Sequence, residues 1–153
     1  MITAGSLTVM TAKDATWCNE MFVSTRGRYA LRVIIDLAEH EADGYTAMRK
    51  VAERQNISLK YLEKILPVLV SEGILHGVHG KGGGYRLARR PEEIKVGDVI
   101  HLTDGDLVTV ACVECNSQPC EKTSECRTKP MWNELNHVIN DYLDGVTIAD
   151  LMM

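Results

Sequence analysis

Four of the five cysteines of this chain lie within a single stretch, ACVECNSQPCEKTSEC, which runs from Ala111 to Cys126. Cys112 and Cys115 form a C-x2-C pair, Cys120 follows after four residues, and Cys126 follows after five more. Thiolates are soft ligands, so this group suits zinc or an iron–sulfur cluster. A structural zinc site usually has two such pairs with a longer span between them, whereas this stretch has one. The spacing therefore favours a cluster over zinc, with thiol oxidation and a metal-free loop as the alternatives.

The N-terminal segment and the short apolar runs indicate where in the cell these thiols act. The first twenty residues show no basic segment followed by an apolar one, so we expect no secretory signal, a cytoplasmic location and reduced thiols. We expect residues 1–20 to be a mobile or non-native tail, and Cys18 within it to be incidental. The longest apolar runs fall far short of the roughly 18 residues that a membrane span needs, which predicts a protein without membrane contact.

The charge is distributed unevenly along the chain. The formal net charge is −4, yet residues 21–90 carry 12 Lys and Arg against 7 Asp and Glu, and residues 91–153 carry 4 against 12. Binding depends on the local field and not on the sum, so the basic half is a candidate for nucleic-acid contact.

Apolar periodicity predicts three helices followed by a hairpin. The first helix follows Ser24, the second covers residues 46–55, and the third begins after Ser58 and continues to about Glu72, with a bend at Pro67. Their apolar stripes contain Ala30, Val33, Ile34, Leu37, Ala38, then Met48, Val51, Ala52, then Leu62, Ile65, Leu66, Leu69, Val70. Strands at 74–78 and 85–87 enclose the glycine-rich tip HGKGGG, and a weaker helix covers 96–102. This order predicts a mostly α fold with a small β-hairpin, the winged helix-turn-helix.

Residues 104–129 read as a loop, and a long amphipathic helix follows from about residue 130 to 143. Its apolar face needs a cover, and a second copy of the chain is the expected one, which predicts a homodimer. The residues expected to pair the subunits are Trp132, Leu135, Val138, Ile139 and Tyr142, within a stripe that also includes Met131. The expected division is therefore a tail at 1–20, a winged helix-turn-helix domain at 21–103, a sensor loop at 104–129 and a dimerisation segment at 130–153.

The third predicted helix is the one that a helix-turn-helix protein places in the major groove of double-stranded DNA. Its outward residues are expected to be Ser58, Lys60, Tyr61, Glu63 and Lys64. Glu63 can accept from cytosine, and the two lysines can reach phosphate or guanine. Contacts to the DNA backbone are expected from Arg26, Arg28 and Arg32 on the first helix and from Lys81 and Arg86 on the wing.

Five segments together resemble the Rrf2 family of bacterial transcription regulators: STRGRYALRVIIDLA, ISLKYLEKILPVLVSEGIL, GVHGKGGGYRLARRPEEIKVGDVI, CRTKPMW and LDGVTIADLM. The resemblance runs from Met21 to the C-terminus and implies a dimeric winged-helix repressor. It places Glu63 where cluster-biogenesis regulators read a base, and His79 where they carry a wing arginine that enters the minor groove. It also implies that Cys112, Cys120 and Cys126 hold a [2Fe–2S] or [4Fe–4S] cluster.

The fourth cluster ligand is where the chain departs from the family pattern. Cluster-biogenesis regulators have a histidine where this chain has Lys129, and nitric-oxide sensors have an aspartate roughly where it has Arg28. Because neither side chain is a good ligand, we expect Cys115 to complete an all-cysteine site. The alternatives are an exogenous fourth ligand, and Cys115 in place of Cys112 as the first of the three family ligands.

Other classes of function remain as alternatives. One is a cluster-free regulator of cysteine metabolism that is controlled by a partner enzyme or by thiol oxidation. Another is a metal- or redox-carrier protein. The five histidines are scattered and none is spaced to activate a nucleophile, so we expect no enzyme.

Overall fold

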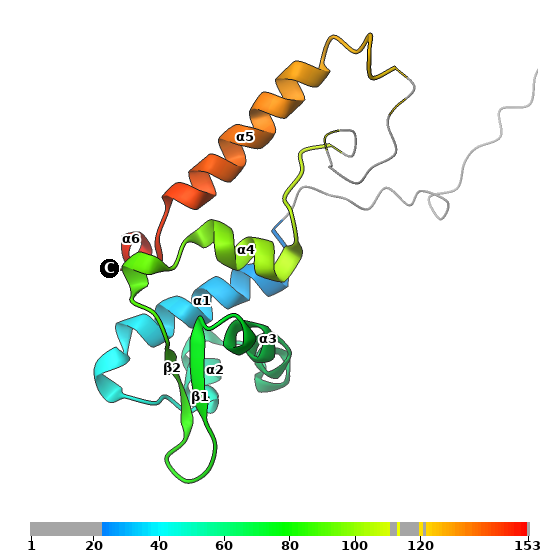
Figure 1. Cartoon of the computed structure of the whole chain (residues 1–153). Helices are drawn as coiled ribbons and strands as arrows, with labels where there is room; N and C mark the ends of the chain where they lie inside the picture. The colour runs from blue at the N-terminus through cyan, green and yellow to red at the C-terminus, as the bar shows by residue number, and fades with distance from the viewer. Residues whose placement is uncertain (1–22, 111–112, 114–119, 121, 153) are drawn as a thin grey trace, which may run out of the picture.

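A computed structural model describes residues 23–110, 113, 120 and 122–152 of the chain (Figure 1). It confirms the predicted fold class, a mostly helical protein with one antiparallel hairpin. The elements in chain order are α1 Thr25–Glu39, η1 Glu41–Asp43, α2 Met48–Gln55, α3 Leu59–Ser71, β1 Leu75–Val78, β2 Gly84–Leu87, η2 Pro91–Glu93, α4 Val96–Asp104, α5 Lys129–Gly145 and α6 Ile148–Leu151.

The core lies where the apolar stripes of α1, α2 and α3 meet. Ala30 and Ile34 of α1, Val51 of α2, and Leu62 and Leu69 of α3 are all fully buried there. Removing such side chains from water supplies most of the free energy that holds short helices together. The first helix begins as predicted, because the Ser24 hydroxyl accepts a hydrogen bond from the Gly27 amide at 3.1 Å.

One buried charge fixes α2 against α1. The carboxylate of Asp36 is 2% exposed and accepts hydrogen bonds from Arg54 Nε at 3.0 Å and from Gln55 Nε2 at 2.9 Å. Burial raises the pKa of Asp36, but the hydrogen bonds from Arg54 and Gln55, with the charge of Arg54, outweigh burial and hold the pKa below its usual value. Asp36 is therefore ionised at neutral pH, and its hydrogen bonds hold the C-terminal end of α2 against α1.

The hairpin pairs Leu75 with Leu87 and is extended by a bridge to Thr46. Thr46 and Tyr85 exchange backbone hydrogen bonds of 2.9 Å in both directions. Because a Cβ on Gly84 would lie 2.3 Å from the Thr46 carbonyl oxygen, this position accepts only glycine. Thr46 thus belongs to the sheet, and the predicted start of the second helix was two residues early.

The C-terminal half packs onto this body through α4. A Cβ on Gly97 would lie 1.9 Å from the Asp144 carboxylate, so the missing side chain lets α4 and α5 approach closely. After α5 the chain returns to the body, where Ile148 is fully buried and its amide donates to the Ile94 carbonyl at 2.9 Å. Figure 1 shows α5 rising from α4 on the side away from the hairpin, with its N-terminal end farthest out.

Other differences from the sequence predictions are local. Val70 is 39% exposed and does not belong to the core. The strands cover 75–78 and 84–87, α4 continues to Asp104, and α5 covers 129–145. The third helix runs through Pro67 without interruption, as expected for one helix.

Candidate nucleic-acid interface and cysteine loop

The N-terminal turn of α3 presents polar side chains to solvent. The Ser58 hydroxyl caps the helix by accepting from the Tyr61 amide at 3.2 Å. Lys60, Glu63 and Lys64 are exposed, and Tyr61 is half-buried. The predicted outward set therefore faces solvent, with Tyr61 only partly exposed.

A hollow of about 330 Å³ lies between the start of α1 and α3, lined by Arg26, Tyr61, Lys64 and Ile65. The Nε atom of Arg26 is buried and has no hydrogen-bond partner in the described part of the chain. Two cationic side chains that line a small hollow form a good site for an anionic oxygen. Arg28, two residues further along α1, is exposed, and its guanidinium donates to Thr25 Oγ1 at 3.1 Å.

The predicted third arginine of α1, Arg32, is exposed and also makes contacts within the chain. Arg32 Nε donates to Gln55 Oε1 at 3.1 Å, and its guanidinium also donates to the Gln55 carbonyl. Its guanidinium lies 5.6 Å from the ring centre of Tyr29, which meets Tyr61 edge to face at 5.4 Å. Arg32 thus links α1 to the C-terminal end of α2, a contact that the sequence alone did not predict.

The wing places three predicted contact residues at one end of the molecule. His79 and Lys81 are exposed in the tip, where Gly80 and Gly82 have positive φ angles of 103° and 81°. Arg86 is exposed on β2 and lies 4.9 Å from the ring centre of Tyr45. The aromatic ring therefore restrains the guanidinium of Arg86 on the side of the wing.

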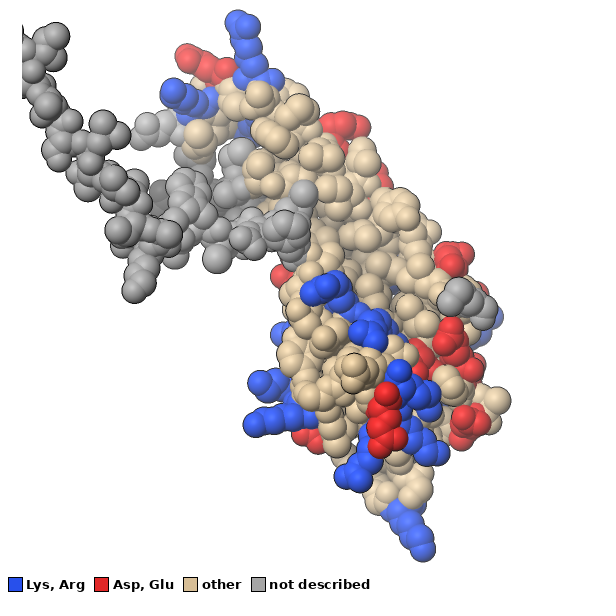
Figure 2. Space-filling view, turned by 180° about the vertical axis from the view of Figure 1, so that it is seen from behind, with Lys and Arg blue, Asp and Glu red and all other residues tan. Residues whose placement is uncertain are grey.

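Basic side chains gather on this end of the molecule. Figure 2 shows most of the Lys and Arg side chains over the half that contains α1–α3 and at the end of the hairpin, with a smaller group at the opposite end of the molecule, while much of the acidic surface lies along one edge. This distribution matches the charge division seen along the sequence. A basic helix beside a basic wing is the arrangement expected for contact with a phosphate backbone.

Two of the four clustered cysteines lie among the described residues. Cys120 is exposed, and Cys126 is half-buried just before α5. Cys126 Sγ lies 3.3 Å from the Thr128 hydroxyl. That hydroxyl, followed by the backbone amides of Thr128 and Lys129, lowers the pKa of the Cys126 thiol. The site at Cys126 thus favours the thiolate, the form that binds metal.

Cys112 and Cys115 lie outside the described residues, so the structure tests neither their positions nor the proposed all-cysteine site. In the described part of the chain, no three potential ligands from His, Cys, Asp and Glu come together. The donor chemistry still fits an iron–sulfur cluster, because a thiolate-stabilising position precedes α5 and three further thiols lie within 14 residues of it in sequence.

The start of the cysteine loop is attached to folded elements. At the first end, Asp104 accepts from the Ser24 amide at 2.7 Å and from its hydroxyl. The Thr109 amide then donates to Asn136 Oδ1 at 3.1 Å, and Asn140 Nδ2 donates to the Leu107 carbonyl at 3.2 Å. The segment that leads into the loop is therefore bound to the start of α1 and to α5, contacts that sequence patterning did not predict.

The outer face of α5 is apolar and exposed. Met131, Leu135, Val138 and Tyr142 are 38–70% exposed, whereas Trp132 and Ile139 are half-buried. The spacing of the four exposed residues, four then three then four, is that of a coiled-coil seam. The predicted pairing residues therefore lie on two neighbouring faces of α5. Leu135, Val138 and Tyr142 lie on the exposed face, and Trp132 and Ile139 lie on the half-buried face.

A winged helix-turn-helix body with a basic recognition helix and wing defines a DNA-binding transcription regulator. The chain matches the Rrf2 family model, described as an iron-dependent transcriptional regulator, over residues 23–153. It is 36% identical to the HTH-type transcriptional regulator IscR of Aliivibrio salmonicida over 133 residues, which are 87% of this chain and 78% of that protein. It is 37% identical to protein rrf2 of Nitratidesulfovibrio vulgaris over 132 residues, 86% of this chain and 87% of that protein.

The solved structures that this chain resembles are also transcription regulators. The global cysteine regulator CymR of B. subtilis superposes with a TM-score of 0.70 at 30% identity, covering 85% of this chain and 95% of that one. IscR of T. potens superposes with a TM-score of 0.66 at 35% identity, covering 85% of each chain. The chain belongs to the Rrf2 family and is a transcription regulator, not an enzyme. None of the helices that the structure describes is long and apolar enough to cross a bilayer.

Proposed function

We propose that this chain is a cytoplasmic homodimeric repressor that binds operator DNA through α3 and the wing and responds to iron–sulfur or redox state through its cysteine loop. The proposed DNA contact rests mainly on the hollow beside α3, because the cationic side chains of Arg26 and Lys64 both line it and Arg26 Nε has no hydrogen-bond partner among the described residues. In this proposal the winged domain is residues 21–103, the sensor loop is 104–129 and the dimerisation segment is 130–153.

The proposed interface divides into positioning and reading contacts. A phosphate occupies the hollow between Arg26 and Lys64, while Arg28, Ser58 and Tyr61 hold neighbouring backbone atoms. Glu63 and Lys60, exposed on the first turns of α3, face base edges in the major groove. His79, Lys81 and Arg86 on the wing contact the adjacent groove and its phosphates. Retention on heparin that falls steeply with salt is the first test of this interface.

A second copy of the chain is the proposed cover for the exposed seam of α5. Met131, Leu135, Val138 and Tyr142 would otherwise remain in water on a helix of 17 residues, about 25 Å long. Trp132 and Ile139 flank this seam and complete the packing. Pairing through α5 sets the separation of two recognition helices, which must match adjacent turns of the major groove, about 34 Å apart.

The proposed cofactor is a [2Fe–2S] or [4Fe–4S] cluster held by Cys112, Cys115, Cys120 and Cys126. When bound, it supplies a redox-active group whose loss or oxidation changes the charge of the loop. The protein contributes the hydroxyl of Thr128 and the amides at the start of α5, which keep Cys126 ready to bind. Asp104 connects the beginning of the loop to Ser24, one turn from Arg28, so a change in the loop reaches the DNA-contacting end of α1.

One alternative within the same class has a specific observation in its favour. CymR of Staphylococcus aureus has been solved in an oxidised form, and it superposes with a TM-score of 0.68 at 34% identity. Cys120 of this chain is exposed, so thiol oxidation without a cluster is the second candidate.

Purification without oxygen, followed by iron and sulfide analysis and a visible spectrum, separates the two candidates. A brown protein with stoichiometric iron and sulfide supports the cluster. A colourless protein whose DNA affinity changes on mild oxidation supports the thiol switch.

A further inference from the structure

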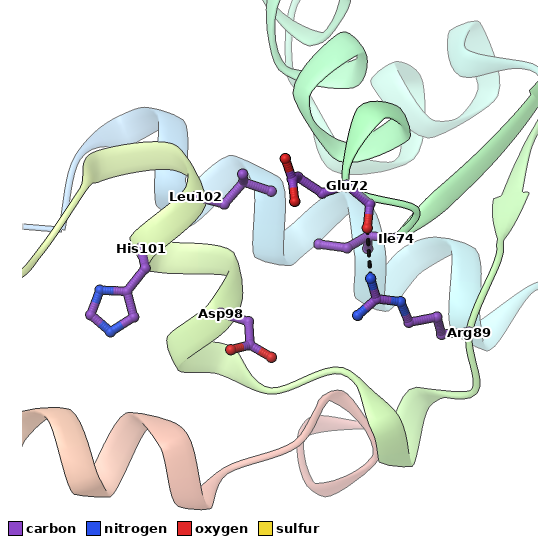
Figure 3. Close-up of a pocket in the computed structure, with 6 residues that line it drawn as sticks. All are labelled: Glu72, Ile74, Arg89, Asp98, His101 and Leu102. Carbon is purple, nitrogen blue, oxygen red and sulfur yellow. Dashed lines mark hydrogen bonds between the residues drawn. The ribbon is translucent and has the colours of Figure 1, made fainter.

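A second hollow, of about 450 Å³, lies between the end of α3, the base of the hairpin and α4 (Figure 3). Its volume is at the lower end of the range for small-molecule sites, so an occupant must be small. Its lining includes neither the DNA-facing turn of α3 nor a cysteine, although the lining residue His101 lies 3.6 Å from Asp106 at the start of the loop. Its lining residues are Glu72, Ile74, Arg89, Asp98, His101 and Leu102.

The hollow contains opposite charges that do not neutralise each other. Arg89 NH2 donates to the Glu72 backbone carbonyl at 2.6 Å, which fixes the guanidinium at the hairpin side. Asp98 projects from α4 toward the space in front of Arg89 (Figure 3). Within the described residues, the ion pairs are Arg54–Asp36, Arg90–Glu93 and His101–Asp106, so neither Arg89 nor Asp98 has a charged partner.

The remaining walls add an apolar surface and a second carboxylate. Ile74 is 3% exposed, and with Leu102 it forms the apolar part of the lining. Glu72 brings its carboxylate from the C-terminal end of α3. One fixed cation, two carboxylates and an apolar patch are complementary to a molecule that has one anionic end, one cationic end and a short apolar body.

We propose that this hollow binds a small zwitterion of the α-amino-acid class. The ligand carboxylate binds the free nitrogens of Arg89, and its ammonium group lies between Asp98 and Glu72. A short side chain lies against Ile74 and Leu102. A phosphate-like dianion is disfavoured by the two carboxylates, and a bare divalent cation is disfavoured by Arg89.

The position of the hollow gives such a ligand a mechanical consequence. Arg89 follows the wing and Glu72 ends the recognition helix, whereas Asp98 belongs to α4, which packs on α5. A ligand held by both sides therefore joins the DNA-contacting elements to the helix that carries the sensor loop.

The test uses the full chain without DNA, so its failure leaves the proposed DNA and cluster sites unaffected. The ¹⁵N-labelled protein is titrated with each common L-α-amino acid, and the amide signals of Ile74 and Leu102 are followed. At least one amino acid is expected to give saturable shifts at micromolar to millimolar concentration. Propionate and ethylamine, which each carry one of the two charges, are expected to give none.

Variants assign the binding to this hollow. Asp98→Asn and Arg89→Gln are each expected to weaken binding about tenfold or more, because each removes one charge-assisted contact. Asp98 is exposed and forms no ion pair in the described part of the chain, so Asp98→Asn should retain the fold even if Arg89→Gln does not. Arg90→Gln is the matched control, because Arg90 pairs with Glu93 outside the hollow. The proposal is overturned if no amino acid gives saturable shifts, or if Asp98→Asn binds as tightly as the wild type.

Discussion

Replacing Arg26 with Gln tests whether the hollow beside α3 holds a DNA phosphate. The substitution removes the cation and leaves a shorter, neutral polar side chain. Arg26 Nε is buried and has no hydrogen-bond partner among the described residues, so the change should remove no internal hydrogen bond at that atom. If the hollow binds a phosphate, the loss should appear in the electrostatic part of DNA binding.

The size of the effect follows from counterion release. Each phosphate contact contributes about 0.9 to the slope of log Kobs against log salt concentration. Arg26→Gln should therefore make the slope shallower by about 0.9. Between 50 and 200 mM salt, this difference corresponds to a factor of about 3.5 in the affinity ratio of wild type and variant. The loss should be the same on specific and non-specific DNA, because a phosphate contact carries no sequence information.

Fluorescence anisotropy on a labelled duplex at several salt concentrations measures the slope. Lys95→Gln is the control, because Lys95 is an exposed cation between η2 and α4, away from the recognition helix. Thermal melting checks that both variants remain folded. If Arg26→Gln leaves the slope equal to that of the wild type and of Lys95→Gln, the hollow does not hold a phosphate.

Three further predictions concern the other parts of the molecule. Val138→Asp should convert the dimer to a monomer, as measured by sedimentation velocity, because Val138 is 54% exposed on the α5 seam. The control Asn133→Asp should remain a dimer. An unchanged mass for Val138→Asp would argue against pairing through α5. The double variant Cys120→Ala, Cys126→Ala should lose iron, sulfide and visible absorbance after oxygen-free purification while its circular dichroism is unchanged; retained iron would place the cluster elsewhere. Asp36→Ala should lower the free energy of unfolding by about 2 kcal/mol, less than for a fully buried pair because its arginine partner is 30% exposed. Because the folded-state pKa of Asp36 is lowered, its contribution is present above the usual value of 3.8 and is lost as the pH falls below it; a wild-type protein whose acid unfolding matches that of the variant would contradict this.

The sequence was most informative where regular patterns decide the structure. Apolar residues at helical spacing identified the buried faces of α1 and α3, and the glycine-rich segment identified the hairpin tip. Ser24 and Ser58 were recognisable as helix starts because a short hydroxyl side chain can satisfy free amides there. These features are local, so they can be predicted without knowing what lies opposite them.

Long-range polar contacts could not be predicted in this way. Asp36 does not break the apolar spacing of α1, and no nearby residue in the sequence indicates that Arg54 and Gln55 bind its carboxylate. Val70 continues an apolar run but is 39% exposed, at a hollow between α3 and the hairpin. The bonds from Asp104 to Ser24 join positions 80 residues apart and depend on how α4 packs across α1. Such contacts follow from the tertiary arrangement, so they require the structure.

The central claim is that two copies of the chain place α3 and the wing in neighbouring grooves of one duplex. A duplex selected from a random pool by the oxygen-free protein and then mapped by hydroxyl-radical footprinting measures this arrangement directly. We expect two symmetric protected regions whose centres are one helical turn, about 10 base pairs, or a multiple of it apart. A single protected region, or selection of no sequence above background, would contradict the claim.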